Sequence, residues 1–501
     1  MSRLRRWMLL VTVASALLLI TLDNSVLYTA LPTLTAELGA SSTQALWIIN
    51  AYPLVMAGLL LGSGTLGDRI GHRRMFLIGL VLFGLASLAA AFSPTAELLI
   101  AARAVLAVGA AAMMPATLAL IRVTFTIERE RNLAIAVWGS ISIIGMAAGP
   151  IIGGVLLAHF WWGSVFLINV PIVIITLVAT KIIAPRDLPD PSKRWDLASS
   201  LLAMITLTGL VFVIKQLAQV DPFWPAVAGA LAAAVIGAVL FVRRQRVLPQ
   251  PLLDFAIFTH PAVAAGVIAA AVSMFAVGGI ELVTTQRFQL VAQFTPLQAG
   301  LLVVPAAAAA LPTAILGGAF LHRIGLRVLI SGGMTVGTLG VVLAATGATT
   351  SLPVLISGLV LVGFGLGATF AVASTAIVGN VPARRAGMAS SVEEVSYEFG
   401  SLIAVALLGS LIGFVYSAAV RLPAGTPGSA ADSLPDALAL GGAEVIAAAR
   451  SAYDLGYLAT LITIAIVTAA GAVVTALLLR HHGPVRADAT PATHRQTEGV
   501  H

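Results

Sequence analysis

Acidic side chains interrupt several long apolar stretches of the sequence. Asp23 lies in the first stretch, Glu281 lies in a later one, and Glu394 and Glu398 stand four residues apart in another. A carboxylate in hydrocarbon is costly unless it is neutralised, so such a group is expected to bind a proton or a cation. Arg103 lies in a further apolar stretch and is expected to face a carboxylate or a cavity for the same reason. These five residues are therefore the candidate proton- and cation-coupling groups.

Two tyrosines are candidate substrate-binding residues. Tyr28 lies in the first apolar stretch, and Tyr397 follows Glu394 by three residues. Glu394, Tyr397 and Glu398 are expected to share one helix face. Two carboxylates and an aromatic ring on one face suit a cation, by charge and by cation–π attraction. The plainer alternative is a helix that enters the membrane only near Gly400, which leaves these acids in water.

Glu281 and Arg103 also have plainer interpretations. Glu281 would be an interfacial residue paired with Arg287, six residues further on. Arg103 lies about 9 Å along a helix from Glu97, so it would snorkel to the outer surface. The sequence leaves both alternatives open.

Composition indicates the elements that position these residues. Apolar residues make up 59% of the 501 residues and charged residues only 10%, with a mean hydropathy of +1.01, which excludes a soluble globular protein. Lipid offers no partner to an unpaired backbone group, so the chain must cross it as α-helices. Runs of about 20 apolar residues predict fourteen spans. Their expected positions are 7–31, 44–66, 75–93, 98–120, 132–158, 164–184, 197–217, 223–242, 261–285, 298–321, 327–347, 353–377, 387–418 and 455–480.

The basic residues stand in small groups between the apolar runs. Most fall on one side, so the positive-inside rule predicts that both termini are cytoplasmic. Despite a pI of about 10.2, this dispersed pattern predicts no nucleic-acid partner. The absence of Cys excludes disulfides and thiolate chemistry, and we expect no catalytic residue and no metal site. The outer loop at about 419–454 is expected to be irregular, and the tail at 485–501 to be disordered.

An internal repeat recurs at a spacing of 254 residues. Five residues around the turn between spans 2 and 3 have identical counterparts between spans 10 and 11: Gly64, Arg69, Ile70, Gly71 and Arg73 match Gly318, Arg323, Ile324, Gly325 and Arg327. The offset pairs spans 1–6 with spans 9–14. We expect a first six-helix bundle at 1–187, two inserted helices at 188–255 and a second bundle at 256–484. Asp23 and Glu281 are then expected to face each other across a central cavity.

The segment from Gly64 to Arg74 resembles the G-x-L-x-D-R-x-G-R-[KR] loop of the major facilitator superfamily. The resemblance implies a conformational switch formed by Gly64, Asp68, Arg69, Gly71 and Arg73. Glycine permits a tight turn near a neighbouring helix, and aspartate can pair with an arginine or a helix N-terminus. The plainer alternative is an ordinary basic turn on the cytoplasmic side.

Span 5 carries a run of small residues that resembles the antiporter motif of drug exporters in this superfamily. The matching residues are Gly145, Gly149, Pro150, Gly153 and Gly154. Small residues let helices approach closely and a proline weakens the helix, so the plainer interpretation is a tight, bendable packing face. The resemblance favours exchange over uptake.

Further segments extend the resemblance over nearly the whole chain. Residues 22–32 match a span 1 pattern that contains Asp23, and Arg103 matches the arginine of a span 4 motif. The chain resembles the fourteen-span drug:proton antiporters, the QacA- and SmvA-like exporters. This implies a monomer of the bacterial inner membrane that exports small hydrophobic cations, such as quaternary ammonium biocides and dyes. The proton gradient would replace any cofactor, and Asp23, Glu281, Tyr28 and Tyr397 would bind substrate. The alternative is a major facilitator exporter of a metabolite or peptide.

Overall fold

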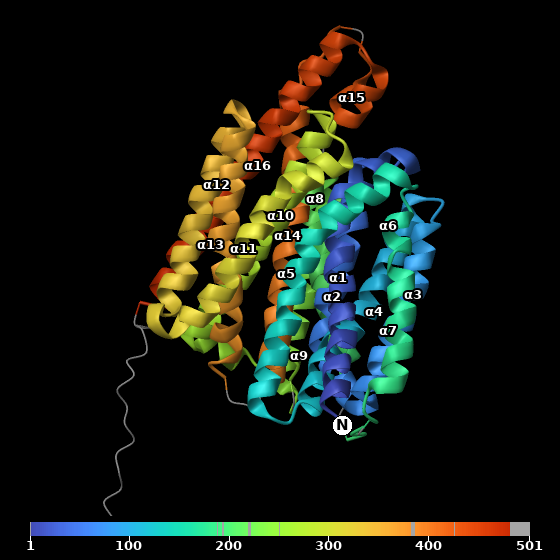
Figure 1. Ribbon diagram of the computed structural model, residues 1–501. Coiled ribbons are helices and arrows are strands. Elements are labelled where there is room, and N and C mark those ends of the chain that lie inside the picture. Colours follow the sequence, from blue (N-terminus) through green and yellow to red (C-terminus); the bar gives the residue numbers. More distant parts are fainter. Residues whose placement is uncertain are drawn as a thin grey trace, which may run out of the picture.

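The computed structural model describes residues 2–187, 189–192, 195–218, 222–249, 251–381, 386–424 and 426–480 (Figure 1). Fourteen helices within these ranges are long and apolar enough to cross a membrane, which confirms the predicted number of spans. The predicted disordered tail at 485–501 lies outside the described residues.

Along the chain, six spans are followed by a hairpin of two helices and then by six further spans. The first group comprises α1 (Arg3–Leu38), α2 (Ser42–Ile70), α3 (His72–Ala91), α4 (Ala96–Thr124), α5 (Glu128–His159), and α6 (Ser164–Leu167) with α7 (Asn169–Ile183) as one span. The hairpin comprises α8 (Leu197–Leu217) and α9 (Trp224–Val247), and the short η1 (Phe255–Thr259) follows it. The second group comprises α10 (Pro261–Leu290), α11 (Pro296–Ile324), η2 (Val328–Gly332) with α12 (Gly333–Thr350), α13 (Leu352–Val378), α14 (Ala386–Ala419) and α16 (Ala443–Leu478).

Helix ends repeat at the same 254-residue spacing. The N-terminus of α2 is closed by a capping box in which Ser41 and Gln44 exchange hydrogen bonds, and Thr295 and Gln298 do the same for α11. The C-terminal ends of α2 and α11 are capped by Gly71 (φ +99°) and Gly325 (φ +85°), a conformation that favours glycine. The repeat therefore sets the start and the end of corresponding helices.

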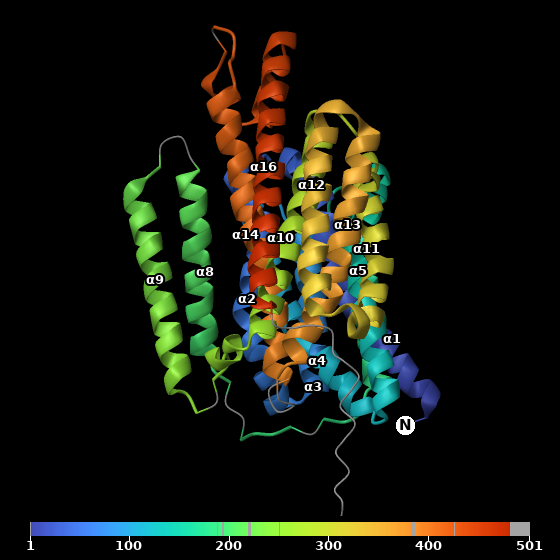
Figure 2. The ribbon, with the colours of Figure 1, turned by 90° about the vertical axis from the view of Figure 1, so that its left-hand side faces the viewer.

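Packing between the halves follows the same symmetry. Within the first half α1 packs on α5 and α2 on α4; within the second, α10 packs on α14 and α11 on α13. Between the halves α5 packs on α11 and α2 on α14, which are equivalent pairs. The α8–α9 hairpin stands outside both bundles, beside α2 and α14, and α8 packs on α2 (Figure 2). We call the face that carries Gly71 and the N-terminus the inner face, because the basic loops predict that it is cytoplasmic.

The first helix is longer than its predicted span. Pro32 was expected to end it, yet α1 continues to Leu38 and ends at Gly39 (φ +58°). Proline has no N–H, so the carbonyl four residues earlier loses its helical partner. That carbonyl belongs to Tyr28 and lies 3.3 Å from Thr285 Oγ1 of α10, whose one proton is nearer to the carbonyl oxygen of Glu281, at 2.7 Å. The second half therefore places a polar group beside the break that Pro32 creates.

The outer loop is also more ordered than predicted. The expectation of an irregular segment at 419–454 is wrong, because η4 (Gly428–Ala431), α15 (Leu434–Leu440) and the first three turns of α16 lie there. Ser433 caps α15 by accepting a hydrogen bond from the N–H of Asp436. Tyr416 Oη donates to the carbonyl oxygen of Ala430 at 2.7 Å and fixes the loop to α14. In Figure 2 this segment projects beyond the rest of the outer face.

Candidate functional site

Asp23 lies in a polar cluster inside the first half. Arg103 of α4 is fully buried (0% exposed) and forms an ion pair with the Asp23 carboxylate. The other carboxylate oxygen accepts a hydrogen bond from Asn169 Nδ2 of α7 at 2.9 Å. Arg103 Nε donates to the carbonyl oxygen of Ile48 at 3.3 Å, and its Cζ lies 4.6 Å from the centroid of the Tyr52 ring. The Asp23 charge is thus neutralised by neighbouring helices.

The structure decides between the two interpretations of Arg103 and corrects the expected position of Asp23. Arg103 faces a carboxylate, as predicted, and does not snorkel toward Glu97. Asp23 and Glu281 do not face each other across the cavity, because Asp23 points into the first half and Ser25 is the residue of α1 that contacts Glu281. Residues two apart on a helix differ by about 200° in direction, so α1 presents opposite faces to the two acids.

Glu281 lies at the contact between the two halves. Its carboxylate oxygen is 2.5 Å from Ser25 Oγ, which is also 2.8 Å from the carbonyl oxygen of Met146. Pro150 of the span 5 motif lacks an N–H and frees that carbonyl, four residues before it. A serine hydroxyl has one proton to donate. That proton is therefore shared between the Glu281 carboxylate and the Met146 carbonyl oxygen, so the Ser25 hydroxyl links α1 to both α10 and α5.

Glu281 was alternatively expected to pair with Arg287. Arg287 forms an ion pair with Asp454 of α16 instead, with 2.8 Å between Nε and Oδ1. Its Cζ lies 4.7 Å from the centroid of the Phe288 ring. The predicted interfacial ion pair between Glu281 and Arg287 is therefore wrong.

An apolar cavity opens beside Glu281, between α5 of the first half and α10, α11 and α13 of the second. Its walls include Pro150, Val277, Val303 and Phe370. Among the described residues that line it, Glu281 is the one ionisable side chain. The α13 wall runs from Leu359 to Phe370, roughly 16 Å at 1.5 Å per residue. A cavity of this kind suits a hydrophobic molecule with a positive charge.

The antiporter-motif residues form the packing face beside this cavity. A Cβ added to Gly145 or Gly149 would lie within 2.4 Å of α1 atoms, and one added to Gly154 would lie 2.4 Å from the Cα of Leu297. Conversely, a Cβ on Gly300 of α11 would lie 2.3 Å from the carbonyl oxygen of Pro150. A Cβ on the remaining glycine, Gly153, would meet Val26 of α1 at 3.0 Å. The motif therefore packs α5 against α1 and α11, as its plainer interpretation predicts.

Further contacts join the outer parts of the two halves. Tyr28 Oη lies 3.1 Å from Ser401 Oγ of α14, and Gln289 Nε2 donates to the carbonyl oxygen of Thr29 at 2.9 Å. On the inner side a second cavity separates the halves, lined by Asp68 and His72 of the switch loop, by α4, and by Glu394 of α14. The described residues thus show a structure that is packed on the outer side and hollow on the inner side.

The acids of α14 lie around Tyr397 and have different contacts. Tyr397 Oη donates to Glu393 Oε1 at 3.2 Å, and its ring stacks on Phe370 with 4.3 Å between centroids. Glu394 lines the inner cavity, and Glu398 interacts electrostatically with Arg103. Tyr397 thus contacts Glu393 directly, and the expected cation site at Glu394, Tyr397 and Glu398 stays a prediction. Arg384 and Arg385, the basic residues that precede α14, lie outside the described residues.

The switch loop is held by a residue that the sequence analysis missed. Asp187, just after α7, accepts hydrogen bonds from the N–H groups of Arg73 (2.7 Å) and Arg74 (3.1 Å) at the start of α3. A Cβ on Gly71 would lie 2.3 Å from the Asp187 Cγ, so the motif glycine makes room for this carboxylate. An acid at a helix N-terminus is a known sequence signal, but Asp187 is 114 residues away from Arg73.

The side chains of the other motif residues have different surroundings. Arg73 Nη2 donates to the carbonyl oxygen of Lys181 in the last turn of α7 at 2.8 Å. Asp68 Oδ1 lies 3.0 Å from His72 Nε2. Arg69 is exposed, and a Cβ on Gly64 would meet nothing within 4 Å. In this conformation Gly71, Arg73 and the backbone of Asp68 contact neighbouring structure.

Comparisons with known proteins agree with this architecture. The Major Facilitator Superfamily profile matches residues 13–405. The methyl viologen resistance protein SmvA of Salmonella typhimurium is 39% identical over 422 residues, which cover 84% of this chain and 85% of SmvA. The multidrug efflux pump LfrA of Mycolicibacterium smegmatis is 36% identical, covering 95% of this chain and 97% of LfrA. The crystal structure of a bacterial homologue of the human lysosomal transporter Spinster, inward-facing and unoccupied, matches with a TM-score of 0.65 at 15% identity, over 97% of this chain and all of that one. The chain is thus a member of the major facilitator superfamily, with multiple spans in the inner membrane.

Proposed function

We propose that this protein exports hydrophobic cationic drugs, biocides and dyes in exchange for protons. The observation that carries the proposal is Glu281, a carboxylate in the wall of an apolar cavity between the two halves. The names of the relatives support export of drugs: SmvA is a methyl viologen resistance protein, LfrA a multidrug efflux pump, and Stp of Mycobacterium tuberculosis, 32% identical, a multidrug resistance protein.

Proton and cation compete for Glu281 in this mechanism. A carboxylate away from water is stable when it is protonated or paired with a cation. With the inner side open, Glu281 releases its proton toward the cytoplasm and binds the drug cation. After the halves rock to the outward-facing state, a proton from outside displaces the drug. The hydrogen bond that Ser25 donates holds the Glu281 carboxylate at the contact between the halves.

Asp23 and Arg103 serve a different purpose in this proposal. Because the two charges neutralise each other, Asp23 is not free to bind a drug in this conformation. We propose that the pair keeps the first half rigid, and that the positive charge of Arg103 attracts Glu398 of α14 in the second half. Tyr28 then acts through Ser401 as a contact between the halves.

An exporter of anionic metabolites or peptides is the second candidate. An anion would need a basic side chain in the cavity, and among the described lining residues the cavity offers none. The geometry therefore favours cations.

The proposal is tested by efflux of ethidium, a hydrophobic monocation, and by resistance to methyl viologen. Wild-type cells should extrude ethidium until an uncoupler collapses the proton gradient. Glu281→Gln should lose at least tenfold of the initial rate, whereas Glu444→Gln, at an exposed glutamate outside the cavity, should not. Equal rates for both variants, at equal expression, would exclude Glu281 as the coupling site. Efflux that ignores the uncoupler would exclude proton exchange.

A further inference from the structure

The two linkers of the α8–α9 hairpin reach different halves of the protein. The first linker follows α7 and touches the switch loop. Besides capping α3 through Asp187, it donates the backbone N–H of Asp190 to the carbonyl oxygen of Asp68 at 2.9 Å. The switch loop of the first half is therefore fixed to the chain segment that leads into α8.

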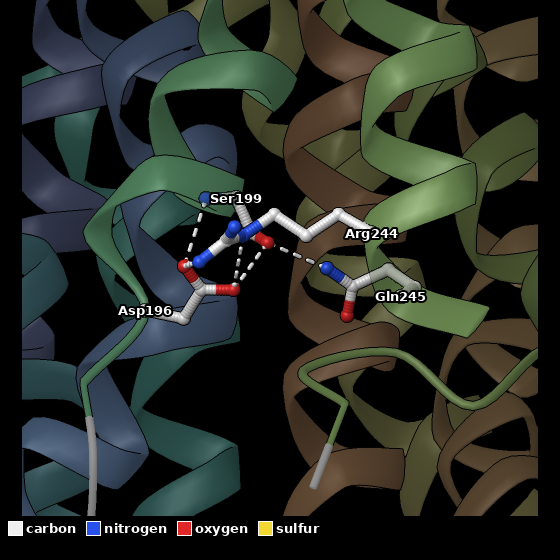
Figure 3. Close-up of polar contacts among 4 residues, drawn as sticks. All are labelled: Asp196, Ser199, Arg244 and Gln245. Carbon is white, nitrogen blue, oxygen red and sulfur yellow. Dashed lines mark hydrogen bonds and ion pairs between the residues drawn. The ribbon is translucent and has the colours of Figure 1, made fainter. Parts of the chain in front are cut away.

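The inner ends of α8 and α9 are clamped together by four side chains (Figure 3). Arg244 of α9 forms an ion pair with Asp196 at the start of α8, with 2.9 Å between Nη2 and Oδ1. Ser199 Oγ donates to Asp196 at 2.5 Å, and Gln245 Nε2 donates to Ser199 at 2.6 Å. Ser199 and Gln245 are 0% and 3% exposed, so this clamp is built into the fold and is not a chance surface contact.

The second linker leads from the clamp to the second half. The backbone N–H of Leu253 donates to Gln245 Oε1 at 3.1 Å, and the N–H of Asp254 lies 3.3 Å from Met388 Sδ at the start of α14. Leu252 of this linker lines the inner cavity together with Asp68 and Glu394. The clamp thus stands between a linker on the first half and a linker on the second, beside the cavity that separates them.

We propose that the α8–α9 hairpin is a tether between the two halves on the inner face, with Asp187 as the positioning residue that connects it to the switch loop. The inference rests on the proposed transport cycle, in which the inner cavity opens and closes. All contacts of the tether are formed while the inner side is open. The tether therefore stabilises the inward-open state and limits how far the inner ends separate.

Ionisation of the clamp supports this role at neutral pH. Burial opposes the charge on Asp196, but hydrogen bonds from Arg244 and Ser199 outweigh it and lower the pKa of Asp196 below its ordinary value. The Asp196 carboxylate is about one tenth exposed and the Arg244 side chain 43% exposed. An ion pair of this kind contributes modestly, and its loss should change the ratio of inward-open to outward-open protein about two- to fivefold.

The sequence has no cysteine, so spin labels can be placed at chosen positions without background. We suggest labels at Val123→Cys on α4 and His322→Cys on α11, both exposed near the inner face. Distances between them are measured by electron–electron resonance on purified full-length protein in lipid nanodiscs. Arg244→Gln should lower the population of the long inner distance two- to fivefold. Arg246→Gln, at an exposed arginine two residues away, is the matched control.

A second set of variants tests the connection through Asp187. Asp187→Ala removes both acceptors at the start of α3 and should lower the same population and the maximal export rate, with KM unchanged. Asp187→Asn keeps one acceptor and should recover part of both. The charge exchange of Asp196→Arg with Arg244→Asp should restore the wild-type distribution where Arg244→Gln alone does not.

Equal distance distributions for Arg244→Gln and Arg246→Gln, or an Asp187→Ala protein that matches wild type, would overturn the tether. Failure of the transport proposal looks different, because wild-type protein would then show no export and no change of distance with ethidium. The two proposals can thus fail separately.

Discussion

The ion pair between Asp23 and Arg103 makes a quantitative prediction about stability. Arg103 is 0% exposed, so Asp23→Asn leaves a buried guanidinium without its counter-charge, which costs about 3–5 kcal/mol. Arg103→Gln leaves the buried Asp23 carboxylate without its counter-charge instead, and it should cost a similar amount.

The effects of the two single variants should therefore not be additive. The double variant, with neither charge, should recover to within about 1 kcal/mol of wild type, because replacing both partners removes the unpaired charge.

The assay is thermal unfolding of the detergent-purified protein at pH 7.5, with the half-life at a fixed temperature as the measure if unfolding is irreversible. A double variant that is no more stable than the weaker single variant would refute the reasoning. Glu97→Gln, at an exposed acid on the same helix as Arg103, is the control.

Three further predictions concern glycines and the switch loop. Gly300→Ala places a Cβ 2.3 Å from the Pro150 carbonyl oxygen and should disfavour the outer-closed state by about 1–3 kcal/mol. The readout is longer distances between spin labels on the outer face. Gly413→Ala, with open space around it, should leave these distances unchanged. Gly71→Ala places a Cβ 2.3 Å from Asp187 and requires φ +99°, so export by the folded variant should fall to near zero. Gly64→Ala should export at the wild-type rate, because a Cβ there meets nothing within 4 Å. Similar export rates for the two variants would contradict the contact with Asp187. Asp68→Asn should lower the maximal rate and leave drug affinity within twofold; a large loss of equilibrium binding would argue against a switch.

Much of the fold follows from properties that single segments carry. Length and apolar content predict fourteen spans because a helix must cover the hydrocarbon by itself. The offset of 254 residues relates helix ends as well as motif residues, and the capping boxes at Ser41 and Thr295 were readable as S-x-x-Q and T-x-x-Q. The continuation of α1 past Pro32 was not readable, because the freed carbonyl lies beside Thr285 of the other half, which is distant in sequence.

The site was predicted less completely because its chemistry depends on rotation about the helix axis. The sequence identifies Asp23, Arg103 and Glu281 as costly groups, but it does not say which of them meet. The first two neutralise each other, and Glu281 meets Ser25 instead. Asn169 and Asp187 were missed as partners because nothing near them in sequence indicates the contact.

The central claim is that a proton and a cation compete for Glu281. The most direct test is proton release from purified wild-type protein, in weakly buffered detergent solution with a pH indicator, on addition of ethidium, methyl viologen, an organic anion or a sugar. We predict release with both cations, none with the anion or sugar, and a loss of most of the release in Glu281→Gln. Undiminished release from Glu281→Gln, or no release from wild type on saturating cation binding, would contradict the account.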